Sequence, residues 1–179
     1  MIRRLLALWR DCRGVAAVEF GVALPVMVVM FCGMYEISAA TITYMKVIDA
    51  ADTVVDLAGQ YKTVSSSDID NFYLAGKMVM QPDSGAALGL AIASVTFDAT
   101  TGNPSVAWQV TRGGAAAMTD AASAATNLGS KGDSVLVTQA TYTYTSILKY
   151  LLPNGLTITS RVFTRPRLVS AVPCTSPCS

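Results

Sequence analysis

Length, composition and charge limit what this chain can be. Its 179 residues fit one domain with an appendage. It is 52% hydrophobic and 14% charged, with a mean hydropathy of +0.44, which is too apolar for an ordinary soluble domain and too polar for a polytopic membrane protein. A net charge of +1 argues against nucleic acid as a partner, because binding phosphates requires a basic surface. The first fourteen residues sum to +3, so the remainder carries about −2.

The basic start is followed by the most apolar segment, VAAVEFGVALPVMVVMFCGM, from Val15 to Met34. As a helix, about twenty residues span the roughly 30 Å core of a bilayer. Glu19 is the only charge in the segment, and Pro25 is tolerated in membrane helices. The arginines ahead of it predict a cytoplasmic N-terminus and an extracytoplasmic remainder. A buried core helix is the alternative, although the segment is long for that.

Two kinds of processing compete for this segment. A secretory signal has an apolar region of about 7–15 residues and then a small-x-small site. The run Ser38 to Ala40 supplies such a site, but the apolar run ahead of it is longer and contains an acid. The other kind cuts ahead of the span, at Gly14. Cleavage there makes Val15 the first residue of the product, Glu19 the fifth and Phe20 the sixth.

The run RGVAAVEFGVALPVMVVM resembles the N-terminus of the TadE-like family, the pseudopilins of the tight-adherence (Tad, or Flp) branch of type IV pili. The resemblance implies a basic leader, residues 1–14, which a membrane aspartyl prepilin peptidase removes between Gly14 and Val15. Phe20 stands where the major Tad pilins usually have Tyr, which indicates a minor, TadE-type component. The closing RPR of residues 165–167 also resembles the family, whereas the middle of the chain matches weakly.

The resemblance also implies a role for Glu19 in assembly. A carboxylate at the centre of a membrane helix costs about 2.5–3.5 kcal/mol and usually has a partner. In the family the Glu pairs with the new α-amine of a neighbouring subunit and sets the stagger between subunits. Glu19 and Phe20 are therefore the expected assembly and register residues. The alternative is that Glu19 reaches the membrane interface from near the helix end.

The helix is predicted to continue beyond the membrane, from Val15 to about Leu57, through an amphipathic extension of residues 35–60. An apolar stripe expected to pack on a globular body recurs at spacings of four and three: Tyr44, Ile48, Ala51, Val55 and Ala58. Another face is expected to be exposed: Lys46, Asp49, Thr53 and Asp56.

Residues 61–168 predict an extracytoplasmic α+β domain with a pilin-like fold, in which the N-terminal helix packs on an antiparallel sheet of about four strands. A helix is expected from a capping Ser66 or Ser67 to Pro82, and a short one near residues 119–127. A hairpin is expected between the first two strands and a turn of residues 148–155 between the last two. Alternating and β-branched runs predict these strands: 90–98, 105–111, 134–147 and 156–167.

Nothing in this domain predicts catalysis. The chain has no histidine, the commonest general base and metal ligand. TRGGAAAM lacks the Lys-Ser/Thr of a phosphate loop, and three aspartates fall near predicted loops, where solvated acids usually lie: Asp98, Asp120 and Asp133. We therefore expect no enzyme activity, no catalytic residue, no metal, no cofactor and no small-molecule substrate.

The cysteines divide by compartment. Cys12 lies in the leader and Cys32 in the span, where an inert packed thiol is expected. Cys174 and Cys178 lie in a tail, residues 169–179, outside the membrane, where disulfides persist. Two thiols four residues apart can close a small ring, so a disulfide is favoured over free thiols, and an exposed tail is the simpler alternative.

Together these features predict a minor pseudopilin of a Tad/Flp pilus assembly machine, acting in pilus biogenesis and adhesion by subunit assembly. It is expected to be a single-pass protein of the bacterial inner membrane. Its expected partners are the prepilin peptidase, other Tad pilins and pseudopilins, and the inner-membrane assembly platform. Whether it enters the pilus stays open. An uncleaved single-span envelope protein with an extracytoplasmic interaction domain is the alternative, and a secreted protein cut after Ala40 is the third.

Overall fold

The computed structural model describes residues 14–146 and 155–175. The chain divides into two compact units, residues 1–39 and 40–179, and the long helix α2, Val15–Gly59, contributes to both. The predicted long helix and the α+β fold class are confirmed. Residues 1–13 of the predicted leader, all but Gly155 of the predicted turn at 148–155, and Cys178 lie outside the described residues.

In the first unit, α2 exposes its apolar side chains on all sides. Every residue from Gly14 to Phe31 is exposed, Val22 to 73% and Phe31 to 74%. The most apolar 18-residue window has a mean hydropathy of 2.3, and none of it is buried. By length and composition this helix can cross a membrane, as expected for residues 15–34.

In the second unit, the remainder of α2 buries one stripe of side chains. Six residues are at most 1% exposed: Val47, Ala50, Ala51, Val54, Val55 and Ala58. The predicted stripe is confirmed at Ala51, Val55 and Ala58, but Tyr44 is 50% exposed. The buried face is turned toward Val47 and Val54 because α2 packs on a second helix as well as on the sheet. Val54 contacts that helix at Gly76, where an added Cβ would lie 3.2 Å from the Val54 side chain.

That second helix, α3, spans Ser66–Val79, and its N-cap is Ser65 instead of the expected Ser66 or Ser67. The hydroxyl of Ser65 accepts a hydrogen bond from the Asp68 N–H (3.3 Å), and the Asp68 carboxylate accepts one from the Ser65 N–H (2.9 Å). This reciprocal capping box forms at Ser65. Ser67 also has an acid three residues later, Asp70, but that carboxylate pairs with Arg112 (2.7 Å). The Ser65 hydrogen bonds lower the pKa of Asp68.

Four antiparallel strands form one sheet: β1 Leu88–Phe97, β2 Pro104–Arg112, β3 Ser134–Tyr144 and β4 Leu156–Thr164. A single 3₁₀ turn, η2 (Gly85–Ala87), leads into β1. The strand order is β2-β1-β3-β4, so the predicted β1–β2 hairpin is confirmed and β1 and β3 occupy the centre. The central strands are the most buried because they have a strand on either side.

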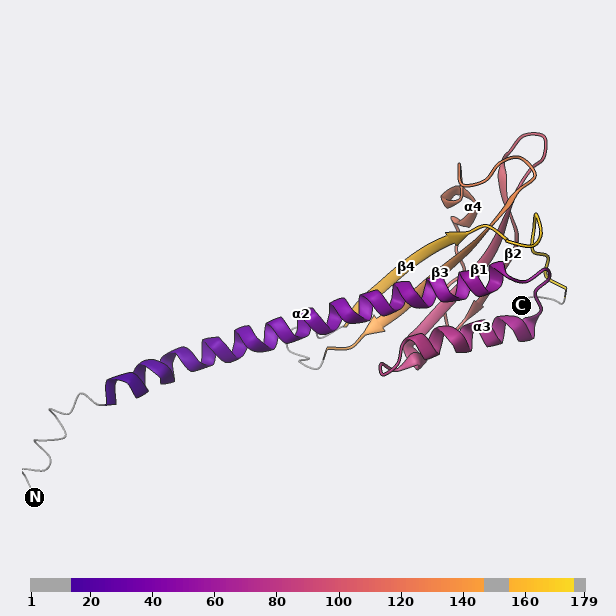
Figure 1. Ribbon diagram of the computed structural model, residues 1–179. Helices are drawn as coiled ribbons and strands as arrows, with labels where there is room; N and C mark the ends of the chain where they lie inside the picture. Colours follow the sequence, from indigo (N-terminus) through magenta and orange to yellow (C-terminus); the bar gives the residue numbers. More distant parts are fainter. Residues whose placement is uncertain (1–13, 147–154, 176–179) are drawn as a thin grey trace, which may run out of the picture. The chain divides into compact units, whose positions relative to one another are not determined.

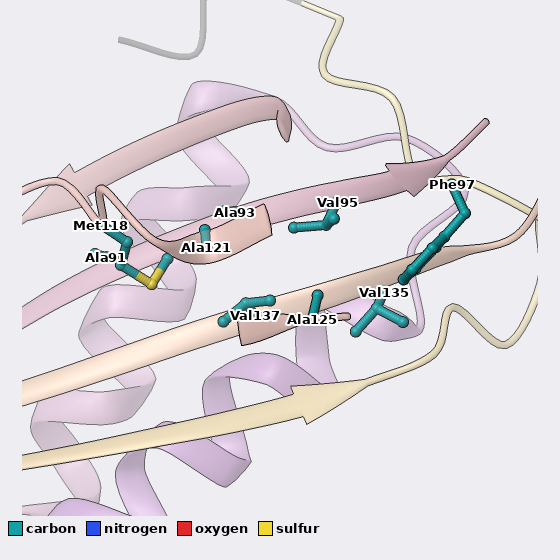
Figure 2. Close-up of a cluster of buried hydrophobic side chains, with 9 residues drawn as sticks. All are labelled: Ala91, Ala93, Val95, Phe97, Met118, Ala121, Ala125, Val135 and Val137. Carbon is teal, nitrogen blue, oxygen red and sulfur yellow. The ribbon is translucent and has the colours of Figure 1, made fainter. Parts of the chain in front are cut away.

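Both faces of the sheet are covered in the second unit. The outer part of α2 together with α3 lies on one face, and the short helix α4, Ala121–Ala124, lies on the other (Figure 1). Beneath α4, a cluster of mostly small buried residues fills the space (Figure 2): Ala91, Ala93, Val95, Phe97, Met118, Ala121, Ala125, Val135 and Val137. The alanines let the α4 segment approach the strands closely. Gly129 is required there, because a Cβ at that position would overlap the Phe97 ring.

Candidate assembly site

The residues predicted for processing lie at the start of α2. Gly14 immediately precedes the helix, and Val15 is its first residue and is 52% exposed. Apart from the adjacent residues and the backbone of the helix itself, no described atom lies within 4 Å of the position that a Cβ on Gly14 would occupy. Nothing in the described structure therefore requires glycine at position 14 for packing.

Glu19 and Phe20 lie in the second turn of the same helix, and both are exposed, Phe20 to 58%. Glu19 lies four residues after Val15, so the two side chains are neighbours on one helix face. Glu19 borders a shallow hollow on the helix surface whose other lining residues are apolar: Val18, Val22, Ala23, Val26 and Met27. A lone carboxylate beside an apolar groove suits a partner that brings a cation and an apolar surface together.

A second acid on α2 was not singled out in the sequence. Glu36 is only 5% exposed, whereas Glu19 is exposed. Glu36 takes part in an interaction with another residue and is therefore not a free carboxylate. The sequence feature that points to Glu36 is its position just beyond the predicted span, since an acid that ends an apolar run is either solvated or paired.

The segment after β4, residues 165–175, is anchored to the domain, and we call it the C-terminal strap. It hydrogen bonds in turn to the end of α2, to β3, to β2 and to the loop between α2 and α3. These bonds are Arg167 N–H to Gly59 O (2.9 Å), Ser134 Oγ to Ser170 O (2.8 Å), Trp108 Nε1 to Val172 O (2.7 Å), Val64 N–H to Pro173 O (3.0 Å) and Thr175 N–H to Val64 O (3.0 Å). Val172 is 1% exposed. The sequence had suggested an appended tail, but up to Thr175 it is part of the domain.

Cys174 lies within the strap, beside Val64, and is disulfide-bonded. Its partner lies outside the described residues, so the pairing with Cys178 stays a prediction. Cys32 is a free thiol in the first unit. The predicted assembly residues and Cys174 therefore belong to different compact units.

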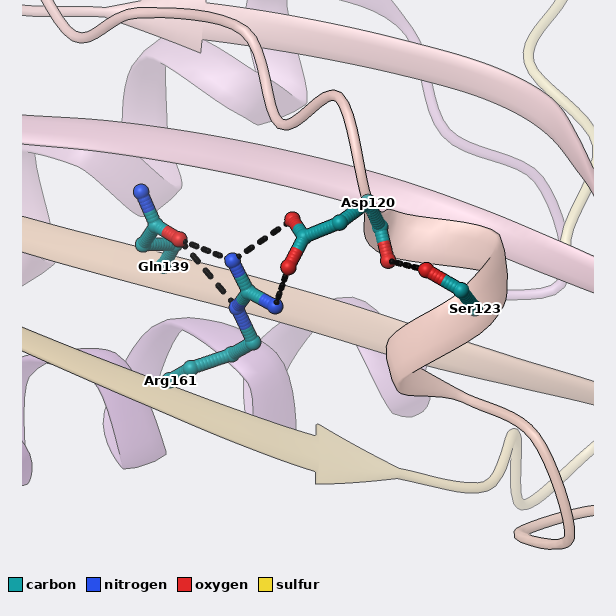
Figure 3. A network of polar contacts seen from close by, with 4 residues as sticks. All are labelled: Asp120, Ser123, Gln139 and Arg161. Carbon is teal, nitrogen blue, oxygen red and sulfur yellow. Dashed lines mark hydrogen bonds and ion pairs between the residues drawn. The ribbon is translucent and has the colours of Figure 1, made fainter.

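The three aspartates near predicted loops all have structural partners. Asp120, which precedes α4, receives two hydrogen bonds from Arg161 of β4 (2.8 and 2.9 Å), and Arg161 also bonds Gln139 of β3 (Figure 3). The Arg161 hydrogen bonds lower the pKa of Asp120. The backbone N–H of Thr101 in the β1–β2 turn lowers the pKa of Asp98, and Asp133 accepts from Ser130 N–H. These contacts hold turns and α4 in place.

The part of the chain that the structure describes contains no set of side chains that could hold a metal ion. Within residues 14–146 and 155–175, no three His, Cys, Asp or Glu side chains lie close enough together to hold a metal ion. The chemistry available at the exposed start of α2 is that of one carboxylate on an apolar surface.

These features define a class of protein: the described residues contain one apolar helix able to cross a membrane, near the N-terminus, and a small antiparallel α+β domain. Residues 14–56 match the sequence model of the family described as TadE-like protein. The match begins at Gly14 and ends within α2, so it covers the helix and none of the sheet. It confirms the resemblance found in the sequence and supports involvement in a Tad pilus system. No curated protein and no solved structure matches the chain.

Proposed function

We propose that this chain is a minor pseudopilin of a Tad/Flp pilus assembly machine, acting by subunit assembly and not by catalysis. One observation carries the proposal. Glu19 is the single carboxylate in the exposed apolar part of α2, from Val15 to Phe31, and this helix begins directly after Gly14, where the TadE-like match also begins. The domain would lie outside the cytoplasmic membrane, and the leader would be removed by a prepilin peptidase.

The mechanism rests on the cost of keeping Glu19 in lipid. Cleavage after Gly14 leaves a charged α-amine on Val15, and the amine of a neighbouring subunit offsets the desolvation of the Glu19 carboxylate. The apolar residues beside Glu19 supply packing surface for the neighbouring helix. A desolvated ion pair adds little net stability, but it penalises every register that leaves either charge alone. Subunits would therefore leave the membrane at one stagger.

The first test is the intact mass and N-terminal sequence of the protein purified from its native membrane. A product that starts at Val15 supports the proposal. A product that starts at Met1 identifies an uncleaved anchor and contradicts the pairing mechanism, and a product that starts at Thr41 identifies a signal peptide. Gly14→Val should block processing without blocking insertion, because the apolar span and the arginines are unchanged.

The second test separates the carboxylate from the helix that carries it. Glu19→Ala should insert at least as well as the natural protein but fail to support piliation. Val29→Ala is the matched control, because it shortens an exposed side chain of the same apolar segment that does not line the hollow and it removes no charge. Normal piliation with Glu19→Ala would remove Glu19 from the mechanism.

A further inference from the structure

The two edge strands of the sheet differ in how they resist the addition of another strand. An unprotected edge offers a row of backbone donors and acceptors, and natural proteins obstruct it with proline, bulges or charge. The edge strand β2 has two of these features. It begins with Pro104, and its pairing with β1 skips Ala107, as at a β-bulge.

The other outer strand, β4, has none of these obstructions. Its nine residues pair with β3 in an unbroken register from Tyr144–Leu156 to Leu136–Thr164. It contains no proline, glycine or lysine, and its one charged residue, Arg161, is engaged by Asp120 and Gln139. Five of its residues are β-branched, the type best suited to a strand: Thr157, Ile158, Thr159, Val162 and Thr164.

The outward backbone groups of β4 also lack a partner in the described structure. Between residues 156 and 164, the backbone hydrogen bonds found within residues 14–146 and 155–175 are those of the β3–β4 ladder. Figure 1 shows β4 as the last strand on its side of the sheet. The two edges therefore differ in kind, since one is obstructed and the other is regular and open.

We propose that the open edge of β4 binds an extended strand of a different polypeptide, which becomes the fifth strand of the sheet. Backbone hydrogen bonds supply the affinity in this mode, and alternate side chains supply the specificity. The partner residues beside Ile158 and Val162, on the α2–α3 face, are apolar. Those beside Thr157, Thr159 and Arg161, on the α4 face, are hydroxylated or acidic, because a basic side chain would oppose Arg161.

A second copy of this chain is a poor occupant for two reasons. Its β2 edge is obstructed, so copies cannot join β4 to β2 in a row. Pairing β4 with β4 antiparallel places the Ala40 ends of the two α2 segments at opposite ends of the pair, because α2 and β4 run in the same direction (Figure 1) and α2 ends beside Thr164. Both of those ends continue into the candidate membrane span. This second reason rests on the membrane insertion proposed above.

Amide hydrogen exchange of the full chain tests the proposal, with the purified protein in detergent compared against the protein in its native membranes. Peptides covering residues 156–164 should exchange at least about tenfold more slowly in the native membranes, and those covering 104–112 should not change. Unchanged rates in β4 would overturn the proposal. Equal slowing of β2, or slowing of β4 that rises with the concentration of purified protein alone, would overturn it in favour of self-association.

A matched pair of variants makes this test specific to the edge. Thr157 of β4 and Thr143 of β3 are direct cross-strand partners, and both are exposed on the same face. Thr157→Lys should abolish the slowing in native membranes, and Thr143→Lys should preserve it, with equal melting temperatures showing that both variants fold. Equal exchange behaviour of the two variants would contradict an edge site. If β4 of the natural protein shows no slowing in native membranes while its product still starts at Val15, this inference is overturned and the proposed pseudopilin function still stands.

Discussion

From Val15 to Phe31, α2 exposes every side chain, whereas from Thr43 to Gly59 it buries a continuous stripe at no more than 2% exposure. The first half is the more apolar of the two, yet it is the exposed half. Its apolar residues have no period, so no single face can be turned inward. The second half alternates apolar and polar residues with the helical period, and the apolar face packs on protein. Periodicity, and not apolar content, decides where this helix meets protein.

The largest difference between the two halves of α2 is expected when an aspartate is introduced into each of them. Val54→Asp, at a position with 0% exposure, should destabilise the second unit by about 4 kcal/mol or more, because it buries an unpaired carboxylate. Val22→Asp, at 73% exposure, should leave the unfolding of that unit unchanged but cost about 2.5–3.5 kcal/mol in membrane insertion. Chemical denaturation and membrane fractionation measure the two effects. Similar denaturation midpoints for the two variants would contradict the comparison.

Replacing one buried and one exposed helix glycine with valine should show the same difference between packed and exposed helix surface. A Cβ on Gly76 of α3 would lie 3.2 Å from both Leu90 and Val54, whereas one on Gly33 of α2 would meet nothing within 4 Å. Gly76→Val should lower the free energy of unfolding by about 1–3 kcal/mol through overpacking. Gly33→Val should leave it unchanged. Denaturant unfolding of both full-length variants checks this, and a Gly76→Val protein as stable as the natural one would show that the helices separate freely.

Acid should weaken the second unit through its paired aspartates. The pKa of Asp120 is lowered in the folded protein by the hydrogen bonds from Arg161. A lowered folded pKa means that the stabilisation is present above the unfolded pKa, about 3.9, and is lost as the pH falls below it. Asp120→Asn should therefore flatten the loss of stability below about pH 4. Thermal melts across that range test it, and an unchanged acid limb would show that the pair adds nothing to stability.

The smallest change in stability is expected at Asp52, on the exposed face of α2 in the second unit. Burial and the neighbouring Asp56 and Asp49 raise the pKa of Asp52, so the folded state disfavours its charge. Asp52→Asn should raise the stability near pH 7 by a few tenths of a kcal/mol through removal of like-charge pairs along the helix. The gain should vanish once the pH falls below the unfolded pKa, where Asp52 is protonated in both states. A gain that persists there would have another cause.

The elements that the sequence predicts well are those set by local pattern. The four strands begin and end within a few residues of their predicted positions, because alternation and β-branching are local signals. The strand order could not be predicted, since the pairing of β1 with β3 joins segments separated by β2 and a long Ala-rich stretch. The Ser65–Asp68 spacing allows the observed N-cap of α3, but Ser67 and Asp70 have the same spacing, so the sequence does not choose between them. The anchoring of Val172 could not be predicted, because its partners lie far away in the chain.

The candidate assembly residues also show the difference between what local sequence predicts and what depends on distant partners. Gly14, Val15, Glu19 and Phe20 could be found because one short local motif contains them all. Their assignment to assembly depends on a neighbouring subunit, and the fold of a single chain does not supply one. The open edge of β4 carries no motif at all, because it is defined by what β2 has and β4 lacks.

The C-terminal strap has a consequence for the order in which the domain is completed. A chain is synthesised from its N-terminus, so Val64, Trp108 and Ser134 are made well before the segment that they bind. The groups that pair with residues 170–175 therefore wait for the last part of the chain. Until residues 170–175 are made, Val64, Trp108 and Ser134 lack these hydrogen-bond partners. Cys174 belongs to the same segment, so its disulfide can form only after the four strands have been synthesised.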